Sequence, residues 1–288
     1  MKKIYLLIAA VALGLGTTQN ASAKSRVETD SLASAVLGSE VKFNVYLPDG
    51  YDNAKHYPVI YLLHGLTDTY SAWIEKGRAN MVADQLIASG ECVPCVIVMP
   101  NAGGTPSATT WNGYFNMPGW NYEDFFFQEF LPFVEKKYNA GGTKGNRAVM
   151  GLSMGGGGSV AYGQKHPDMF SSCYAMSAWL DNKDTGVKYH EGKRDCLYYV
   201  CKAVCDNSSL SFAANASPET IKSLKGVKWF LDIGDDDFLL DLSFELFKLY
   251  KSAGVKCELR VRDGVHNWEY WHSAFHTALP FASRNFSN

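Results

Sequence analysis

The sequence predicts an α/β domain with a mostly parallel central sheet and helices on both of its faces. Strand-like and helix-like segments alternate along almost the whole chain, which is typical of βα units. Several of the strand-like segments are continuous apolar runs, as expected for parallel strands buried on both faces. The chain has 288 residues, of which 47% are hydrophobic, so it is long enough for one large domain with a sizeable core.

The first 23 residues have the layout of a secretory signal peptide. Two lysines precede an apolar run of thirteen residues, and the segment ends in Ala21-Ser22-Ala23, an A-x-A cleavage pattern. The apolar run is shorter than the ~20 residues of a membrane-spanning helix. We therefore expect cleavage after Ala23 and a secreted or periplasmic protein without a stable membrane anchor. An uncleaved N-terminal anchor is the alternative.

The net charge and the cysteine content limit which partners and cofactors we expect. The formal net charge of −2 argues against a nucleic-acid partner. Cys92 and Cys95 form a C-x-x-C pair, but no helix N-terminus follows to activate a thiolate, so a structural role is favoured over a redox role. Cys196, Cys201 and Cys205 cluster in a loop-rich stretch, where we expect one local disulfide. Zinc-type spacings of Cys and His are missing from the sequence, so we expect no metal and no cofactor.

The elements follow one another in a regular order, and residues 24–288 are expected to form a single domain. Apolar runs or alternation predict seven strands, at 41–48, 57–65, 95–100, 147–153, 173–180, 227–234 and 255–264. Helical spacing predicts six helices, at 70–90, 122–138, 154–166, 217–226, 239–254 and 268–286.

Two helix ends and two irregular stretches stand out between these elements. Ser217 is expected to cap the helix at 217–226, with Pro218 at its first position, and a glycine ends the helix at 239–254. Residues 101–121 show no period. Residues 181–216 are polar and look like a lid-like insertion.

A glycine-flanked serine stands between the predicted strand 147–153 and the next helix. Residues 151–155, GLSMG, have the G-x-S-x-G pattern, in which a sharp strand-to-helix turn exposes the serine and leaves no space for side chains on the flanking glycines. A phosphate-binding loop would need a lysine after the glycines, and Ser159 and Val160 follow instead. A dinucleotide fingerprint would have to follow the first strand. Ser153 is therefore the candidate nucleophile.

A serine nucleophile of this kind needs an acid and a histidine, in the chain order Ser, Asp or Glu, His. His266 follows the strand at 255–264 and an acidic run follows the strand at 227–234, so both lie at carboxyl ends of strands, where open α/β sheets bind ligands. The histidine would accept the proton of Ser153, and the acid would orient the imidazole. The sequence leaves several carboxylates as candidates for the acid: Asp232, Asp235, Asp236, Asp237 and Asp241.

Backbone N–H groups near the serine are expected to form an oxyanion hole. One donor would be the N–H of Met154, at the start of the helix that follows the nucleophile. The other would be the N–H of Leu66, in the loop after the first buried strand. His64 precedes this loop and is expected to shape it.

The sequence resembles the esterase D family of α/β-hydrolases, which includes feruloyl esterases, acetyl-xylan-type esterases, S-formylglutathione hydrolase and mycolyltransferases. The resemblance covers the chain from about residue 41 to the C-terminus, outside 181–216. It rests on YPVIYLLHGLTDTYSAW, VIVMPNAGG, EFLPFVEKKY, NRAVMGLSMGG, KHPDMFSS, DIGDDDFLL and DGVHNWEYW. It implies an α/β-hydrolase fold, and the family's G-x-x-D-F pattern matches Gly234 to Phe238 and selects Asp237 as the acid.

Among exported members, this sequence looks most like feruloyl and related carbohydrate esterases of plant-polysaccharide degradation. The resemblance implies a secreted serine esterase that hydrolyses feruloyl or acetyl esters, either small or linked to a polysaccharide such as xylan. An acyltransferase, a general short-chain carboxylesterase and a non-catalytic glycan-binding protein are the alternatives. Four tryptophans are candidates for stacking on the substrate, with core packing as the alternative for each: Trp111, Trp120, Trp179 and Trp268.

Overall fold

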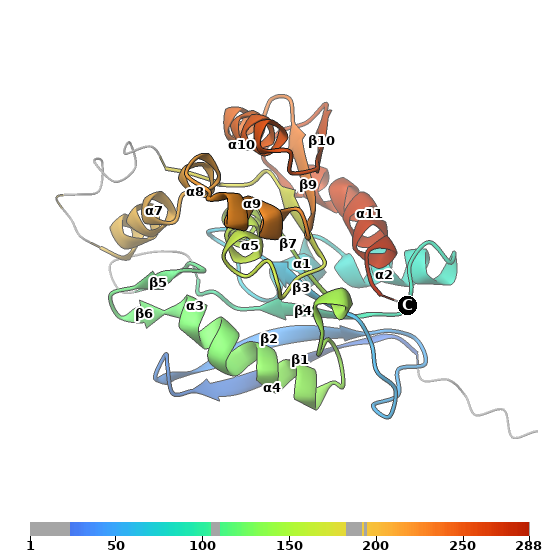
Figure 1. Cartoon of the computed structure of the whole chain (residues 1–288). Helices are drawn as coiled ribbons and strands as arrows, with labels where there is room; N and C mark the ends of the chain where they lie inside the picture. Colours follow the sequence, from blue (N-terminus) through green and yellow to red (C-terminus); the bar gives the residue numbers. More distant parts are fainter. Residues whose placement is uncertain (1–23, 105–109, 183–191, 193–194, 288) are drawn as a thin grey trace, which may run out of the picture.

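The computed structural model describes residues 24–104, 110–182, 192 and 195–287. Eight strands form one sheet in the order β1-β2-β4-β3-β7-β8-β9-β10, and β5 and β6 form a separate hairpin (Figure 1). β2 pairs antiparallel with β1 and β4, and all pairs from β4 to β10 are parallel. The predicted mostly parallel sheet is therefore confirmed. The strands are β1 (Arg26–Ser34), β2 (Ser39–Leu47), β3 (Val59–Leu63), β4 (Val96–Pro100), β5 (Asn116–Met117), β6 (Trp120–Asn121), β7 (Arg147–Leu152), β8 (Ser172–Met176), β9 (Lys228–Gly234) and β10 (Cys257–Arg262).

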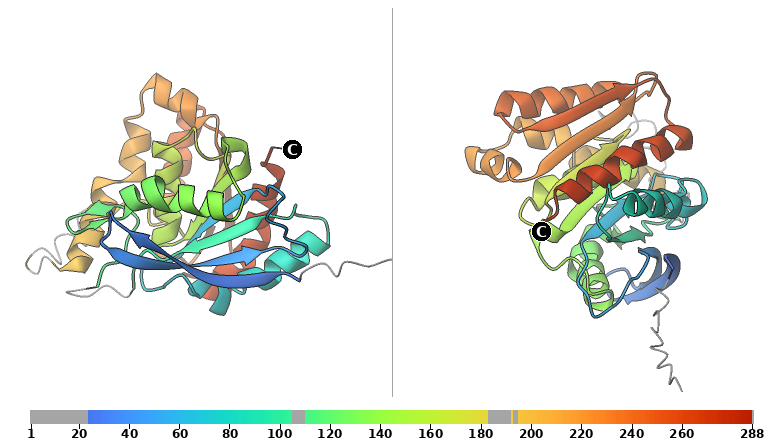
Figure 2. Two further views of the ribbon diagram at one scale, coloured as in Figure 1. Left: turned by 90° about the horizontal axis from the view of Figure 1, so that it is seen from below. Right: turned by 90° about the vertical axis from the view of Figure 1, so that its right-hand side faces the viewer.

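Helices cover both faces of this sheet (Figure 2). α2 and α11 pack on one face, while α5, α10 and the helix that starts at α3 lie on the other. The helical segments are α1 (Ala72–Glu75), α2 (Ala79–Ala88), α3 (Tyr122–Asp124), the π-helix η1 (Phe125–Phe130), α4 (Leu131–Lys137), the 3-10 helix η2 (Lys144–Asn146), α5 (Met154–Lys165), α7 (Cys196–Asp206), α8 (Ser209–Ala214), α9 (Pro218–Leu224), α10 (Leu240–Ala253) and α11 (Trp268–Arg284).

The buried strands explain the continuous apolar runs of the sequence. In β3 every side chain is fully buried, and successive residues point to opposite faces. Tyr61 belongs to the core under α5, whereas Ile60 and Leu62 belong to the core under α2 and α11. A strand buried on both faces must be apolar at every position, which is why its sequence shows no alternation.

Helix boundaries follow the signals in the sequence. The Ser217 hydroxyl accepts a hydrogen bond from the Thr220 N–H at 3.2 Å, and Pro218 is the first residue of α9. Gly254 ends α10 with a φ of 69°, a left-handed conformation that favours glycine. The helix predicted at 122–138 is also present, with a π-helical segment at η1 that brings Phe125, Phe126 and Phe130 into the core together.

Three regions contain elements that the sequence did not reveal. The stretch 101–121 holds the short hairpin of β5 and β6. β1 was missed because it is an edge strand with few buried side chains, so it carries no apolar pattern. The stretch 181–216 contains α7 and α8, although it showed no strong period. The buried face of α7 consists of Cys196, Val200, Cys201, Ala203 and Val204, an amphipathic spacing that was overlooked among the polar residues of this stretch.

The expected disulfide among Cys196, Cys201 and Cys205 is wrong. In the described chain, which includes all seven cysteines, no disulfide is formed. Cys196 and Cys201 are buried on α7 and pack as small apolar groups. The strand expected at 173–180 ends at Met176, because Ser177 turns the chain out of the sheet with a φ of 46°.

The predicted signal peptide, residues 1–23, lies outside the described residues. Within the part of the chain that is described, no helix combines the length and apolar character needed to cross a membrane.

Candidate active site

Ser153 joins β7 directly to α5 in a conformation that is unusual for a residue with a side chain. Its φ of 53° and ψ of −118° lie outside the common regions. The Ser153 N–H donates to the Met176 carbonyl at 2.9 Å, and its carbonyl accepts from the Trp179 N–H at 2.9 Å. These two hydrogen bonds, to the last residue of β8 and to the segment that follows it, hold the strained turn in place.

The glycines around Ser153 allow the close packing that the turn requires. A Cβ on Gly155 would lie 2.6 Å from the carbonyl oxygens of Leu63 and His64, so α5 starts against the end of β3. A Cβ on Gly157 would lie 2.1 Å from the Trp179 carbonyl oxygen. Neither Gly155 nor Gly157 therefore has space for a side chain.

Three side chains that follow different strands form one hydrogen-bonded chain. The Ser153 hydroxyl lies 2.9 Å from Nε2 of His266. Nδ1 of His266 lies 2.9 Å from Oδ2 of Asp237 and 3.1 Å from Oδ1. When Nδ1 donates to the carboxylate, Nε2 is left as the acceptor that faces the serine hydroxyl. The arrangement has the geometry of a nucleophile, a base and an orienting acid.

Asp237 differs from its two acidic neighbours in burial. It is 3% exposed, whereas Asp235 and Asp236 are exposed, and the Asp235 carboxylate accepts the Gly264 N–H at 3.0 Å. Burial by itself raises the pKa of Asp237. Hydrogen bonds from His266, from the Leu239 N–H and from Ser177 outweigh burial and hold this pKa below its usual value. The structure therefore brings an ionised Asp237 to His266.

Aromatic rings contact both sides of this chain. The Phe238 ring is 77% exposed, with its centroid 4.5 Å from that of His266. The buried Trp271 ring meets the imidazole at 90°, with centroids 4.9 Å apart. Rotation of the His266 ring is therefore restricted on one side by the core.

The loop after β3 is fastened to the loop after β4. His64 is 1% exposed, its Nδ1 lies 2.8 Å from the Gly65 carbonyl, and its Nε2 accepts the Ala102 N–H at 3.0 Å. The Tyr114 hydroxyl accepts the His64 N–H at 2.7 Å. Burial lowers the pKa of His64 to about 4, so the ring is neutral near pH 7 and can accept from Ala102.

The two expected oxyanion donors belong to the start of α5 and to the loop after β3. Met154 is the first residue of α5, where helix N–H groups lack partners within the helix. Leu66 lies in the fastened loop, and its carbonyl accepts a hydrogen bond from the buried Asn112 side chain. Gly65 approaches the nucleophile closely, because a Cβ added there would lie 3.7 Å from the Ser153 Cβ. The oxyanion role of Leu66 and Met154 stays a prediction.

The four candidate tryptophans are all partly exposed but differ in their surroundings. The backbone N–H of Trp179 donates a hydrogen bond to the Ser153 carbonyl, so Trp179 lies next to the nucleophile. Trp268 packs edge-on against Trp73 and Trp271, which is a packing role.

The other two tryptophans lie in the stretch between β4 and α3. The Trp111 ring lies 5.8 Å from that of Tyr199 on α7, and Trp120 stacks on Tyr122 at 5.7 Å. Substrate contact by these rings stays a prediction.

Several residues that support the site gave no signal in the sequence. Tyr114 and Asn112 fasten the loop of Leu66, and Ser177 and Trp271 contact the acid and the base. Tyr114, Asn112 and Ser177 have partners that are distant in the chain, whereas Trp271 ends the DGVHNWEYW stretch near His266, where no supporting role was assigned to it.

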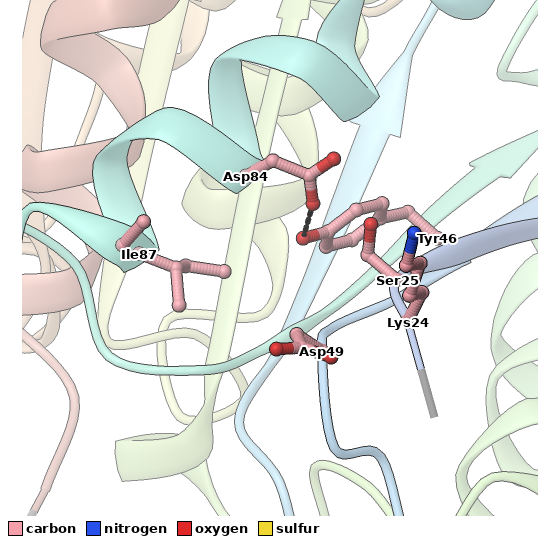
Figure 3. A pocket seen from close by; sticks show the side chains of 7 residues that line it. Lys24, Ser25, Tyr46, Asp49, Asp84 and Ile87 are labelled. Atoms are coloured by element: carbon pink, nitrogen blue, oxygen red, sulfur yellow. Dashed lines mark hydrogen bonds between the residues drawn. The ribbon is translucent and has the colours of Figure 1, made fainter. Parts of the chain in front are cut away.

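A separate surface cavity of about 390 Å³ lies beside β2 and α2, where the Tyr46 hydroxyl donates to Asp84 at 2.7 Å (Figure 3). Its lining does not include Ser153, His266 or Asp237. Within the described residues, no cluster of three or more His, Cys, Asp or Glu side chains could hold a metal ion.

This fold and site define an α/β-hydrolase esterase, and comparison with known proteins agrees. The chain belongs to the Esterase family, which matches residues 34–282. An endo-1,4-beta-xylanase/feruloyl esterase of Xylanibacter ruminicola is 33% identical over 79% of this chain, and the chain spans 27% of that protein's length.

Solved structures show the same relationship. A ferulic acid esterase is 46% identical with a TM-score of 0.86, covering 91% of this chain and 99% of that one. The S-formylglutathione hydrolase of Staphylococcus aureus, at 18% identity, shares the fold with a TM-score of 0.70, over 91% of this chain and all of its own. The chain is thus an esterase related to carbohydrate esterases, as the resemblance implied.

The buried His64 generates a prediction for stability against pH. Its pKa is about 4 in the folded protein and near the usual 6.5 when unfolded, so between these values the unfolded chain binds more protons. The free energy of unfolding should therefore fall as the pH is lowered through this window, by at most about 3 kcal/mol from this group.

Urea denaturation between pH 7 and pH 4 measures this dependence. His64→Gln should be less stable at pH 7 but show a flatter decline than the wild type. His56→Gln, which replaces an exposed histidine, is the matched control and should keep the wild-type decline. If the free energy of unfolding falls equally in all three proteins, His64 has the same protonation in the folded and unfolded states, which would contradict the prediction.

Proposed function

We propose that this chain is a secreted serine esterase that releases feruloyl or acetyl groups from plant cell-wall polysaccharides such as xylan. The observation that carries the proposal is the hydrogen-bonded chain from Ser153 through His266 to Asp237. The 46% identity to a ferulic acid esterase over 91% of the chain supports the acyl group. The name of the Xylanibacter relative, which includes a xylanase activity, supports a xylan-linked substrate.

In the proposed reaction, the Ser153 Oγ attacks the ester carbonyl while Nε2 of His266 takes the hydroxyl proton. The C–O bond to the alcohol then breaks, and the imidazolium gives its proton to the departing alkoxide. A water molecule, deprotonated by the same nitrogen, attacks the acyl-enzyme and releases the carboxylic acid and free Ser153. Asp237 remains ionised throughout and stabilises the imidazolium that forms in each half-reaction.

The negative oxygen of each tetrahedral intermediate would be bound by the N–H groups of Leu66 and Met154. A donor of this kind contributes about 3 kcal/mol to lowering the barrier. The positive end of the α5 dipole adds to this stabilisation, because Ser153 stands at the helix N-terminus. Met154 is part of a rigid helix and Leu66 of a fastened loop, so the donors need little reorganisation during the reaction.

Export is the second part of the proposal. The signal layout of residues 1–23 supports it, and polysaccharide substrates are too large to enter a cell. Expression of the full chain in a bacterial host that secretes proteins should yield a mature form that begins at Lys24. Intact-mass measurement checks this, and a mature form that retains residues 1–23 would contradict it.

Removal of the nucleophile tests the chemistry. Ser153→Ala should abolish hydrolysis of methyl ferulate and of short-chain nitrophenyl esters, and labelling by a fluorophosphonate probe, because the proposed reaction begins with attack by the Ser153 hydroxyl. Circular dichroism should show an unchanged fold. Residual hydrolysis at the wild-type rate would contradict the assignment.

Assays of the wild type with methyl ferulate, acetylated xylan and a lipid ester rank the acyl groups by rate. Adding a carbohydrate acceptor to these assays reveals any acyl transfer.

The acid is tested by comparing three neighbouring aspartates. Asp237→Asn should lower kcat for methyl ferulate by about 10⁴, since an amide stabilises the wrong imidazole tautomer. Asp235→Asn and Asp236→Asn change exposed carboxylates and are the matched controls. A larger loss in either control than in Asp237→Asn would identify a different acid.

A further inference from the structure

Two buried residues, Trp271 and Ser177, lie next to the His266–Asp237 pair. Trp271, on the first turn of α11, packs against the imidazole of His266, with centroids 4.9 Å apart. Its indole Nε1–H donates to the Ser177 Oγ at 2.9 Å. Ser177 is fully buried directly after β8, and its hydroxyl lies close enough to the Asp237 carboxyl to lower the pKa of that group. One tryptophan–serine unit thus reaches both the base and the acid.

The direction of these hydrogen bonds follows from the chemistry of the groups. An indole N–H can only donate, so the Ser177 oxygen must accept from Trp271. The serine proton is then free to point elsewhere, and the neighbouring ionised carboxylate of Asp237 is its acceptor. The indole therefore sets the direction in which the hydroxyl donates. Asp237 accepts hydrogen bonds from Nδ1 of His266 and from the Leu239 N–H, and the Ser177 hydroxyl lies beside the same carboxylate.

The backbone of Ser177 has a strained conformation that its surroundings hold in place. Its φ of 46° is left-handed, which is uncommon for a residue with a side chain and occurs where the surroundings impose it. Its N–H donates to the Asp232 carbonyl at 2.8 Å. The Asp232 side chain is itself buried and accepts from the hydroxyls of Tyr174 and Tyr270.

This support ties together the strands that carry the site. Tyr174 lies in β8, Asp232 in β9 and Tyr270 in α11, and Arg262 of β10 lies 3.6 Å from the Asp232 carboxylate. The position of Ser177 is thus determined by the same elements that carry Asp237 and His266.

We propose that Trp271 and Ser177 are positioning residues for catalysis: Ser177 holds the Asp237 carboxylate toward His266, and Trp271 fixes both the Ser177 hydroxyl and the His266 ring. This inference rests on the proposed serine-esterase mechanism but not on the identity of the acyl group. Neither residue touches the substrate, so their loss should slow turnover and leave substrate binding unchanged.

The test compares Ser177→Ala with Ser159→Ala in the full chain. Ser159 is an equally buried serine, but its hydroxyl donates to the Gly155 carbonyl within α5 and does not contact Asp237 or His266. Ser177→Ala should lower kcat for a nitrophenyl acetate by about tenfold to a hundredfold at constant KM, the effect of one hydrogen bond to a charged group. Ser159→Ala should leave kcat unchanged.

A spectroscopic readout separates positioning from packing. The proton between Nδ1 of His266 and Asp237 gives a low-field ¹H NMR resonance, which should shift or broaden in Ser177→Ala and in Trp271→Phe but not in Ser159→Ala. Trp271→Phe keeps a ring against His266 and removes the N–H, so its kcat should fall less than that of Ser177→Ala. If Ser177→Ala does not fold, Ser177→Gly removes the same hydroxyl at a φ that glycine adopts freely.

Wild-type kcat and an unshifted resonance in Ser177→Ala would overturn the proposal, as would an equal loss of kcat in Ser159→Ala. An inactive wild type on every ester would instead contradict the proposed function. In that case the rate at which a fluorophosphonate labels Ser153 tests the role of Ser177, because labelling needs the same base and acid but no ester substrate. Slower labelling in Ser177→Ala supports the positioning role, and an unchanged rate overturns it.

Discussion

The whole site depends on one close backbone contact, where the first turn of α5 packs against the end of β3. A Cβ on Gly155 would lie 2.6 Å from two main-chain carbonyl oxygens, so any side chain there would push the helix away from the sheet. The contact places Ser153 above the sheet edge and brings the Met154 N–H beside the loop of Leu66. Without it, the strained turn at Ser153 would have no reason to form, because its conformation is unfavourable in isolation.

Around this contact the protein holds its polar groups rigid before any substrate arrives. His64 is kept neutral by burial and joins two loops, while the carboxylate of Asp237 is kept ionised by three hydrogen bonds. Burial alone would favour the protonated acid, so the donors are what make the carboxylate useful to His266. Groups fixed in advance stabilise developing charge without the reorganisation that water would require. This is the physical basis on which the partly exposed Ser153 hydroxyl becomes a candidate nucleophile.

The parts that surround this framework are of a different kind. β5, β6 and α7 come from stretches without a clear period in the sequence. The Trp111 ring, in the loop before β5, contacts the ring of Tyr199 on α7. The S-formylglutathione hydrolase of Staphylococcus aureus shares the fold at 18% identity, so one scaffold accommodates different sequences.

The sequence by itself determined seven of the eight strands of the main sheet, most helices and the candidates Ser153 and His266, because apolar periodicity and turn glycines are local properties of the chain. It narrowed the acid to a run of aspartates, and the family pattern pointed to Asp237. Tertiary structure alone showed which carboxylate is buried beside His266, that α7 carries cysteines without a disulfide, and that Ser177 and Trp271 support the pair. These depend on contacts between strands and helices far apart in the chain, and a hydrogen-bond partner that lies about a hundred residues away leaves no periodic trace in a local pattern.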